Sequence, residues 1–294
     1  MKKLNKLMIL MAMMVMTMGL TACEFHVSTG SSDEKKDEEV QEEVVEEEVK
    51  EDEEEPEKEI VEDVESTDVQ DEEEEINLDD VNDWQSLISE LDTEYAKVAW
   101  TNVDSVFEEN PGVVVSTVPG KEFGSDVLIV AITNLYEDGF CFSGTAKALA
   151  ADGSVVGETY IYEGCIGSGN TIVEYIDCDS LPDGRIEWED CDATETDQEF
   201  VPWEGEYEGN FSDDGEYLTI DYTVNATDGT ACDEGPVTIL LVDEDGNVIG
   251  VALDYMEEIE EDGSFSNSVD VYGDDGPIPD NSDVAFFANP IKKK

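Results

Sequence analysis

Between residues 99 and 291 the chain alternates short apolar runs with polar stretches rich in Gly, Asp and Asn. The clearest segment has apolar residues at every second position: Leu218, Ile220, Tyr222 and Val224. A period of two is the pattern of a strand with one buried face, whereas apolar residues three and four apart indicate a helix. The region lacks the strand–helix–strand rhythm of a parallel sheet. It therefore predicts an all-β fold.

Blocks of sequence recur in the same order in the two halves of this region. Residues 127–134 (VLIVAITN) match residues 218–225 (LTIDYTVN), and three further pairs of blocks follow: 141–144 with 232–235, 151–157 with 244–250, and 181–183 with 278–280. The period of about 95 residues suits a β-sandwich domain and is long for a solenoid repeat. We therefore predict two tandem antiparallel Ig-like β-sandwich domains, at residues 99–194 and 195–291.

Turn residues indicate where the predicted strands reverse. Asp152-Gly153 and Asp245-Gly246 each lie between apolar runs, and Asp-Gly in that setting is a strong signal for a β-hairpin. Residues 182–184 (PDG) predict a second turn in the first repeat, with residues 185–188 as the closing strand. The equivalent closing strand of the second repeat is expected at residues 284–287.

The block Asp-Gly-x-Val-Val/Ile-Gly, which follows an apolar strand in each repeat, resembles FxLYD-type domains of bacterial surface proteins. The resemblance covers about fifty residues in each repeat. It implies an Ig-like sandwich. The family's namesake pentapeptide is absent: residues 147–151 (KALAA) and 239–243 (ILLVD) stand in its place.

Helical spacing appears just before the first repeat, at residues 83–98. Asp83 is a suitable N-cap residue, and five apolar residues follow at spacings of three and four: Trp84, Leu87, Ile88, Leu91 and Tyr95. We expect a short helix packed on the first domain. A helix that binds a partner is the alternative.

An acidic region of low complexity precedes the helix. Residues 33–80 hold 28 Asp and Glu and only 4 Lys. Like charges four residues apart oppose a helix, and the few valines are too sparse to form a core. Self-repulsion should extend such a chain. We therefore predict that residues 23–82 form a disordered acidic tether.

The N-terminus has three positive charges, at Lys2, Lys3 and Lys6, followed by an uncharged run of about fifteen residues. This is the pattern of a secretory signal peptide, because the run is too short for the ~20 residues that span a bilayer. The run ends in Leu20-Thr21-Ala22-Cys23, which resembles the lipobox of bacterial lipoproteins. The resemblance implies removal of residues 1–22 and attachment of diacylglycerol to the Cys23 sulfur. The expected location is the extracytoplasmic face of a bacterial cell membrane, in a Gram-positive envelope.

The charge of the chain limits its partners. The formal net charge is −64, from 78 Asp and Glu against 14 Lys and Arg. Nucleic acid is excluded as a partner, because its binding depends on neutralisation of phosphates by Lys and Arg. Adsorption to anionic lipid is excluded for the same reason, so attachment to the membrane must depend on the lipid at Cys23.

The residues needed for common catalytic sites are scarce. His26 is the only histidine, and it lies three residues after Cys23, outside the predicted domains. This excludes Ser-His-Asp and Cys-His catalysis in the domains, together with zinc sites that contain histidine. Paired carboxylates of the kind that cleave glycosides stay open as an alternative, although no pair stands out among so many acids.

Two further features carry candidate chemistry. Asp243, Asp245 and Asn247 cluster oxygen ligands of the kind that calcium prefers, although Asp and Asn there also suit a hairpin turn, which we prefer. The large aromatic residues are predicted to lie in the sandwich cores, with a carbohydrate- or peptide-binding patch as the alternative: Trp100, Trp188, Trp203, Phe286 and Phe287.

Export to an oxidising exterior permits disulfides among the five cysteines after Cys23. Residues that face each other across a hairpin have a constant sum of residue numbers. On this basis the turn at residues 152–153 pairs Cys141 with Cys165. A hairpin turn at residues 183–185 would pair Cys178 with Cys191, which leaves Cys232 free. The alternative is that all five stay reduced as small buried residues.

These observations predict a lipid-anchored surface protein that is not an enzyme and has no cofactor. It would bind a surface protein, peptide or glycan, or fill a structural role, with two sandwich domains on an acidic stalk. The alternatives are an extracytoplasmic enzyme or enzyme accessory that uses carboxylates on carbohydrate, a calcium-dependent adhesion module, and a solute-binding lipoprotein. The lack of an α/β pattern argues against the last of these.

Overall fold

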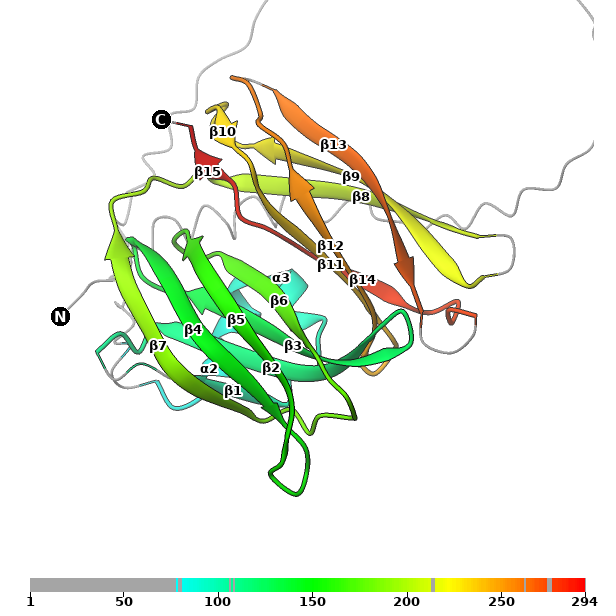
Figure 1. Cartoon of the computed structure of the whole chain (residues 1–294). Helices are drawn as coiled ribbons and strands as arrows, with labels where there is room; N and C mark the ends of the chain where they lie inside the picture. The colour runs from blue at the N-terminus through cyan, green and yellow to red at the C-terminus, as the bar shows by residue number, and fades with distance from the viewer. Residues whose placement is uncertain are drawn as a thin grey trace, which may run out of the picture. The chain divides into compact units, whose positions relative to one another are not determined.

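The computed structural model describes residue 78 and residues 81–293, apart from 106, 108, 213–214, 262 and 274–276 (Figure 1). The predicted signal peptide, Cys23 and nearly all of the predicted tether lie outside the described residues. Strands make up 59% of the structure and helices 6%, so the all-β prediction is confirmed. No described helix has the length and apolar character needed to cross a membrane.

The first repeat forms two antiparallel sheets, each named here after its central strand. The β3 sheet has the strand order β1-β2-β3-β6, and the β4 sheet has the order β5-β4-β7 (Figure 1). The strands are β1 (Asn102–Ser105), β2 (Val113–Glu122), β3 (Ser125–Asn134), β4 (Gly139–Leu149), β5 (Val155–Ile166), β6 (Thr171–Asp177) and β7 (Ile186–Thr196). β7 runs two residues past the predicted domain boundary at 194.

The second repeat also forms two antiparallel sheets. The β9 sheet has the order β13-β9-β8, and the β11 sheet has the order β12-β11-β14; β10 and β15 form a separate short pair. The strands are β8 (Trp203–Phe211), β9 (Tyr217–Ala226), β10 (Cys232–Asp233), β11 (Gly235–Val242), β12 (Val248–Met256), β13 (Ser264–Tyr272), β14 (Asp283–Ala288) and β15 (Ile291–Lys292).

The sequence repeat corresponds to a repeat of topology. The matched blocks at 127–134 and 218–225 are the central strands β3 and β9, each flanked by two strands of its own repeat. The β4 sheet likewise corresponds to the β11 sheet. The Asp-Gly turns connect β4 to β5 and β11 to β12, as predicted, and Gly153 and Gly246 both have positive φ, at 84° and 80°.

The two repeats stack head to tail through non-equivalent sheets. Leu240, Val251 and Phe287 of the β11 sheet belong to the same buried cluster as the core of the first repeat. The β3 sheet of the first repeat therefore packs between its own β4 sheet and the β11 sheet of the second. Thr238 Oγ1 on β11 donates a hydrogen bond of 2.8 Å to the Val173 carbonyl on β6 across this junction.

The stacking explains why the matched strands differ in burial. In β9, Leu218, Ile220, Tyr222 and Val224 are buried and the residues between them are not, which confirms the predicted half-buried strand. In β3 every residue from 127 to 134 is buried, because both faces of its sheet are covered. Continuous apolar runs such as VLIVAI are the sequence pattern of strands buried on both faces.

The predicted helix forms as two short helices, α2 (Trp84–Leu91) and α3 (Thr93–Ala96). Asp83 caps α2 as predicted, and its carboxylate accepts a hydrogen bond of 3.0 Å from the Ser86 amide. Asp92 adopts an extended conformation between the helices and caps α3 in the same way. The segment contacts β14 of the second repeat as well as the first repeat, so the expected contact with the first domain alone was incomplete.

The predicted second hairpin of the first repeat is wrong. β6 ends at Asp177 in the β3 sheet, whereas β7 begins at Ile186 in the β4 sheet. Residues 178–185 therefore cross from one sheet to the other. The turn residues were identified correctly, with φ of 89° at Gly184, but a turn signal does not specify which sheet receives the next strand.

Candidate functional site

The cysteines divide into one bonded pair and three free thiols in the described part of the chain. Cys141 on β4 faces Cys165 on β5, and the structure joins them by a disulfide with a Cα–Cα distance of 3.8 Å. Cys178, Cys191 and Cys232 are free. The predicted bond between Cys178 and Cys191 is therefore wrong, because these residues belong to the crossover and to β7 of the other sheet and do not face each other across a hairpin.

The free thiols lie in surroundings that keep them protonated. Burial raises the pKa of Cys178 to about 11 and that of Cys232 to about 11, and it raises the pKa of Cys191 as well. The thiolate is the reactive form of cysteine, so these shifts work against a role as nucleophile. Cys23, the predicted lipid-attachment residue, lies outside the described residues.

The candidate calcium ligands form a turn held by their own hydrogen bonds. The Asp243 carboxylate accepts from the amides of Asp245 and Asn247 at 3.0 and 2.9 Å, and from the Asn247 side chain at 2.9 Å. These bonds lower the pKa of Asp243 against the opposing effect of burial. Within the described residues no group of three or more His, Cys, Asp and Glu side chains is placed to hold a metal ion.

The same turn anchors the helical segment to the second repeat. The Gly246 carbonyl accepts a hydrogen bond of 2.9 Å from the Ala99 amide, just after α3. A Cβ atom at Gly246 would lie 2.9 Å from that amide nitrogen. The equivalent Gly153 of the first repeat has no atom within 4 Å of such a Cβ, so its turn is open.

A network of polar side chains joins the helical segment to the edge strand β14. Lys97 Nζ donates to the Val284 carbonyl at 2.7 Å, to the Tyr207 hydroxyl at 2.7 Å and to the Glu94 carboxylate at 3.0 Å. The Tyr207 hydroxyl also donates to the Val284 carbonyl, at 3.1 Å, and Glu94 accepts from the Phe286 amide at 2.8 Å. We call these three side chains and their bonds to β14 the β14 clasp.

Burial and charge oppose each other in the β14 clasp. Burial disfavours the charge on Lys97, but Glu94 and Tyr207 outweigh it and raise the pKa of Lys97 above its ordinary value. Burial raises the pKa of Glu94, and Lys97 limits that rise. All three N–H donors of the Lys97 ammonium have acceptors, which is what a partly buried charge requires. In the sequence, Glu94 and Lys97 have the i,i+3 spacing of an ion pair on an exposed helix. That spacing did not predict their hydrogen bonds to β14.

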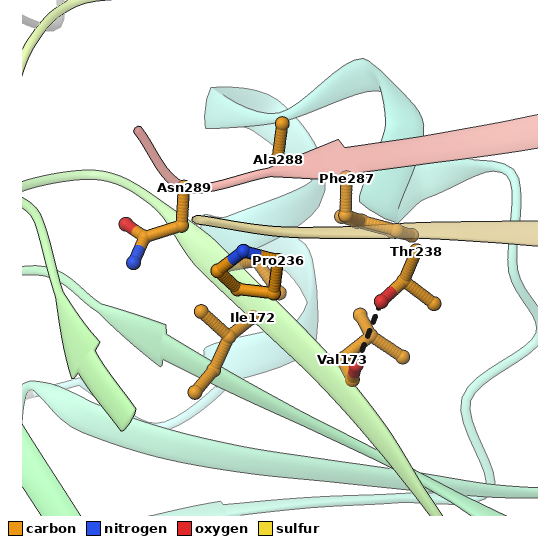
Figure 2. A pocket seen from close by; sticks show the side chains of 8 residues that line it. Ile172, Val173, Pro236, Thr238, Phe287, Ala288 and Asn289 are labelled. Carbon is orange, nitrogen blue, oxygen red and sulfur yellow. Dashed lines mark hydrogen bonds between the residues drawn. The ribbon is translucent and has the colours of Figure 1, made fainter. Parts of the chain in front are cut away.

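A small hollow lies where β6 meets β11 and β14, as Figure 2 shows. Ile172 and Val173 line it from β6, opposite Pro236 and Phe287 of the second repeat. It has no room for a water molecule, whereas ligand pockets usually have a volume of roughly 300 Å³ or more. Thr238 and Val173 both line the hollow, and the hydrogen bond between them is drawn in Figure 2. The hollow is therefore part of the packed junction.

A larger groove opens near the end of β12. Its volume is about 650 Å³, and its lining is mostly acidic: Gln198, Asp233, Glu234, Tyr255, Glu257, Glu258 and Ile291. The four carboxylates would attract cations and repel anions. Nothing in the sequence pattern indicated this groove, because its residues come from four separate segments of the second repeat and carry no shared spacing.

The large aromatic residues lie in or against the cores, as predicted. Trp100, Phe286 and Phe287 are buried, and Trp188 and Trp203 pack partly buried against the two core clusters. The aromatic residues that are exposed, such as Phe123, are not among those that the sequence analysis named. Phe123, at the turn between β2 and β3, is 64% exposed, and its ring centre lies 4.8 Å from that of Tyr272 on β13.

Comparison with known proteins adds little to this picture. No family model matches the chain, and no curated protein matches it. One solved structure to which the chain is similar is the C-terminal globular domain of oligosaccharyltransferase from Pyrococcus abyssi. The identity is 12%, the alignment covers 67% of this chain and 47% of that chain, and the TM-score is 0.16. The chain thus spans about half the length of that structure, and the likeness is too weak to carry an argument about function.

Proposed function

We propose that the protein is a lipid-anchored surface protein on the extracytoplasmic face of a bacterial cell membrane, with a binding or structural role and no enzymatic activity. The observation that carries the proposal is the order of three features at the N-terminus. A basic start is followed by an uncharged run and then by Leu20-Thr21-Ala22-Cys23. This order resembles the signal peptide and lipobox of bacterial lipoproteins. Diacylglycerol on the Cys23 sulfur would attach the chain to the membrane.

The arrangement of the remaining chain supports a role at a distance from the membrane. Leu78 is buried in the core of the first repeat and Val81 packs against that core, so the predicted end of the tether at residue 82 is wrong. Residues 23–77 would form an acidic tether that is extended by charge repulsion and holds the sandwiches away from the bilayer. The two repeats belong to one compact unit with a shared buried cluster, so they would be presented to a partner together. The partner would be a surface protein, a peptide or a glycan. Nucleic acid is excluded by the net charge of −64.

Detergent partition tests the anchor. The full chain, expressed in a bacterium with lipoprotein processing, should enter the detergent phase, because two or more acyl chains hold a protein firmly to a membrane. Cys23→Ala should move it to the aqueous phase. Cys178→Ala is the matched control, since it removes a free thiol of the folded part and should leave the protein in the detergent phase. If Cys23→Ala partitions like the parent, the lipoprotein interpretation is wrong.

A further inference from the structure

β14 lies at the edge of its sheet, and among the described residues no strand pairs with it on the side away from β11. Its register with β11 pairs Ala285 with Leu240 and Phe287 with Thr238. The Val284 carbonyl and the Phe286 amide bond to the side chains of Lys97 and Glu94 and not to β11. Alternate residues of a strand direct their amides and carbonyls to opposite sides, so the backbone groups of Val284 and Phe286 face away from β11. An apolar edge of this kind is a template for pairing with another strand.

Side chains occupy the free edge of β14 in place of a strand. The Val284 carbonyl accepts from Lys97 and from Tyr207, and the Phe286 amide donates to Glu94. The Val284 amide donates to the carboxylate of its neighbour Asp283 at 2.7 Å. Glu94 thus supplies an acceptor for the Phe286 amide, and Lys97 supplies a donor for the Val284 carbonyl two residues earlier on β14. A neighbouring strand would offer an acceptor and a donor at these same positions.

Two contacts with the first repeat hold α3 in the position that the β14 clasp requires. The Tyr95 hydroxyl and Ser116 Oγ on β2 lie 2.6 Å apart, and the Tyr95 ring stacks on Trp100 with 5.0 Å between ring centres. Tyr95 is fully buried. The first repeat therefore fixes the helix from which Glu94 and Lys97 reach the second repeat.

β14 needs this cover more than the edge strand β8 does. The edge strand β8 carries exposed Glu204, Glu206 and Glu208, and charges of this kind discourage strand addition. From Val284 to Ala288, β14 has no charged residue and every residue is buried. Beyond Asp283 at its start, β14 supplies no charge of its own, so the charges at Val284 and Phe286 come from α3 and the residue after it.

We infer that the β14 clasp blocks strand addition, and that without it β14 pairs with β14 of a second copy of this chain. Two identical strands that meet antiparallel are self-complementary, so such pairing forms a closed two-fold dimer. It would join two β11 sheets into one continuous sheet through the backbone groups of Val284 and Phe286. The α2–α3 segment is then a strap that keeps the protein monomeric.

The test replaces the charged pair in the full-length chain with apolar residues of similar size, as Glu94→Leu with Lys97→Met. Apolar replacement of a buried ion pair is often tolerated by the fold. The expected result is a monomer-to-dimer shift in sedimentation equilibrium with an unchanged circular dichroism spectrum. The Phe286 amide should exchange with deuterium roughly fivefold faster or more in the monomer at low concentration, because it loses its acceptor. The Ala285 amide, which faces β11, should be unaffected.

The matched control is the ion pair between Lys147 and Glu189 on the β4 sheet, where the Glu189 carboxylate is mostly exposed. Lys147→Met with Glu189→Leu makes the same change in composition away from β14 and should leave the protein monomeric. A folded clasp variant that stays monomeric, or dimerisation of both variants alike, would overturn the inference.

If the clasp double variant does not fold, Lys97→Met alone decides the inference. This variant removes the stronger of the two donors to the Val284 carbonyl, leaves Tyr207 as the other, and keeps the Glu94 acceptor. A concentration-dependent dimer, weaker than that expected for the double variant, supports the inference. A monomer at all concentrations overturns it.

Discussion

Leu240→Ala tests whether the two repeats unfold as one cooperative unit. Leu240 lies on β11 with no exposed surface, and its side chain belongs to the buried cluster of the first repeat. Its neighbours across the sheet are Val251 on β12 and Ala285 on β14, which belong to the same cluster. Truncation would therefore leave a cavity at the junction between the repeats.

The magnitude follows from the usual cost of truncating a fully buried leucine. Replacement of a buried leucine by alanine costs about 2–5 kcal/mol of unfolding free energy. For a folded region of roughly 200 residues, 1 kcal/mol lowers the midpoint of thermal unfolding by ~2–4 °C. Scanning calorimetry of Leu240→Ala should therefore show one transition, shifted down by roughly 4–20 °C.

Two variants make the result specific. Leu241 is the next residue on β11 and is fully buried in the core of the second repeat, so Leu241→Ala should lower the same single transition by a comparable amount. Leu253 on β12 is 44% exposed, so Leu253→Ala should change stability by no more than about 0.5 kcal/mol. The shared core would be refuted if the parent protein showed two separate transitions. In that case Leu241→Ala would shift only one of them, and Leu240→Ala would shift neither.

Two further variants test a turn and a partly buried carboxyl group. Gly246→Ala should destabilise the protein more than Gly153→Ala: both residues have positive φ, which costs an alanine about 1–2 kcal/mol, but only Gly246 lies against the Ala99 backbone. Equal losses in chemical denaturation would show that the contact with Ala99 is unimportant. Burial raises the pKa of Glu174, so the folded protein binds the carboxyl proton of Glu174 more tightly than the unfolded chain does. The contribution of Glu174 to the free energy of unfolding therefore falls as the pH rises from about 4 through the raised pKa. Glu174→Gln should therefore raise the melting temperature at pH 8 and change it little at pH 4, and a lower melting temperature at pH 8 would contradict this account.

Features that depend on neighbours in the chain were predictable from the sequence. The alternation of Leu218, Ile220, Tyr222 and Val224 predicted β9 and its buried face, and Asp83 predicted the start of α2. The register of β4 with β5 was predictable for the same reason. A tight turn at residues 152–153 sets which residues face each other, as it does for Cys141 and Cys165.

The failed pairing of Cys178 with Cys191 shows where local information ends. A turn signal reports that the chain reverses, but the next strand can join the same sheet or the opposite one. Here residues 178–185 cross to the β4 sheet, and the choice depends on packing between strands far apart in sequence. The same limit applies to the acidic groove, whose residues come from four separate segments.

The all-β class, the two repeats, the helical segment and the apolar runs of β3 and β11 follow from local sequence, because each depends on periodicity or on residues close together in the chain. What covers those runs follows from contacts between residues far apart in the chain. The β3 and β11 sheets have apolar residues on both faces and bury the second face against each other, which makes one compact unit of the two repeats. The Glu94–Lys97 pair has the spacing of an exposed helical ion pair, and it reaches the edge of β14 only because the repeats stack head to tail.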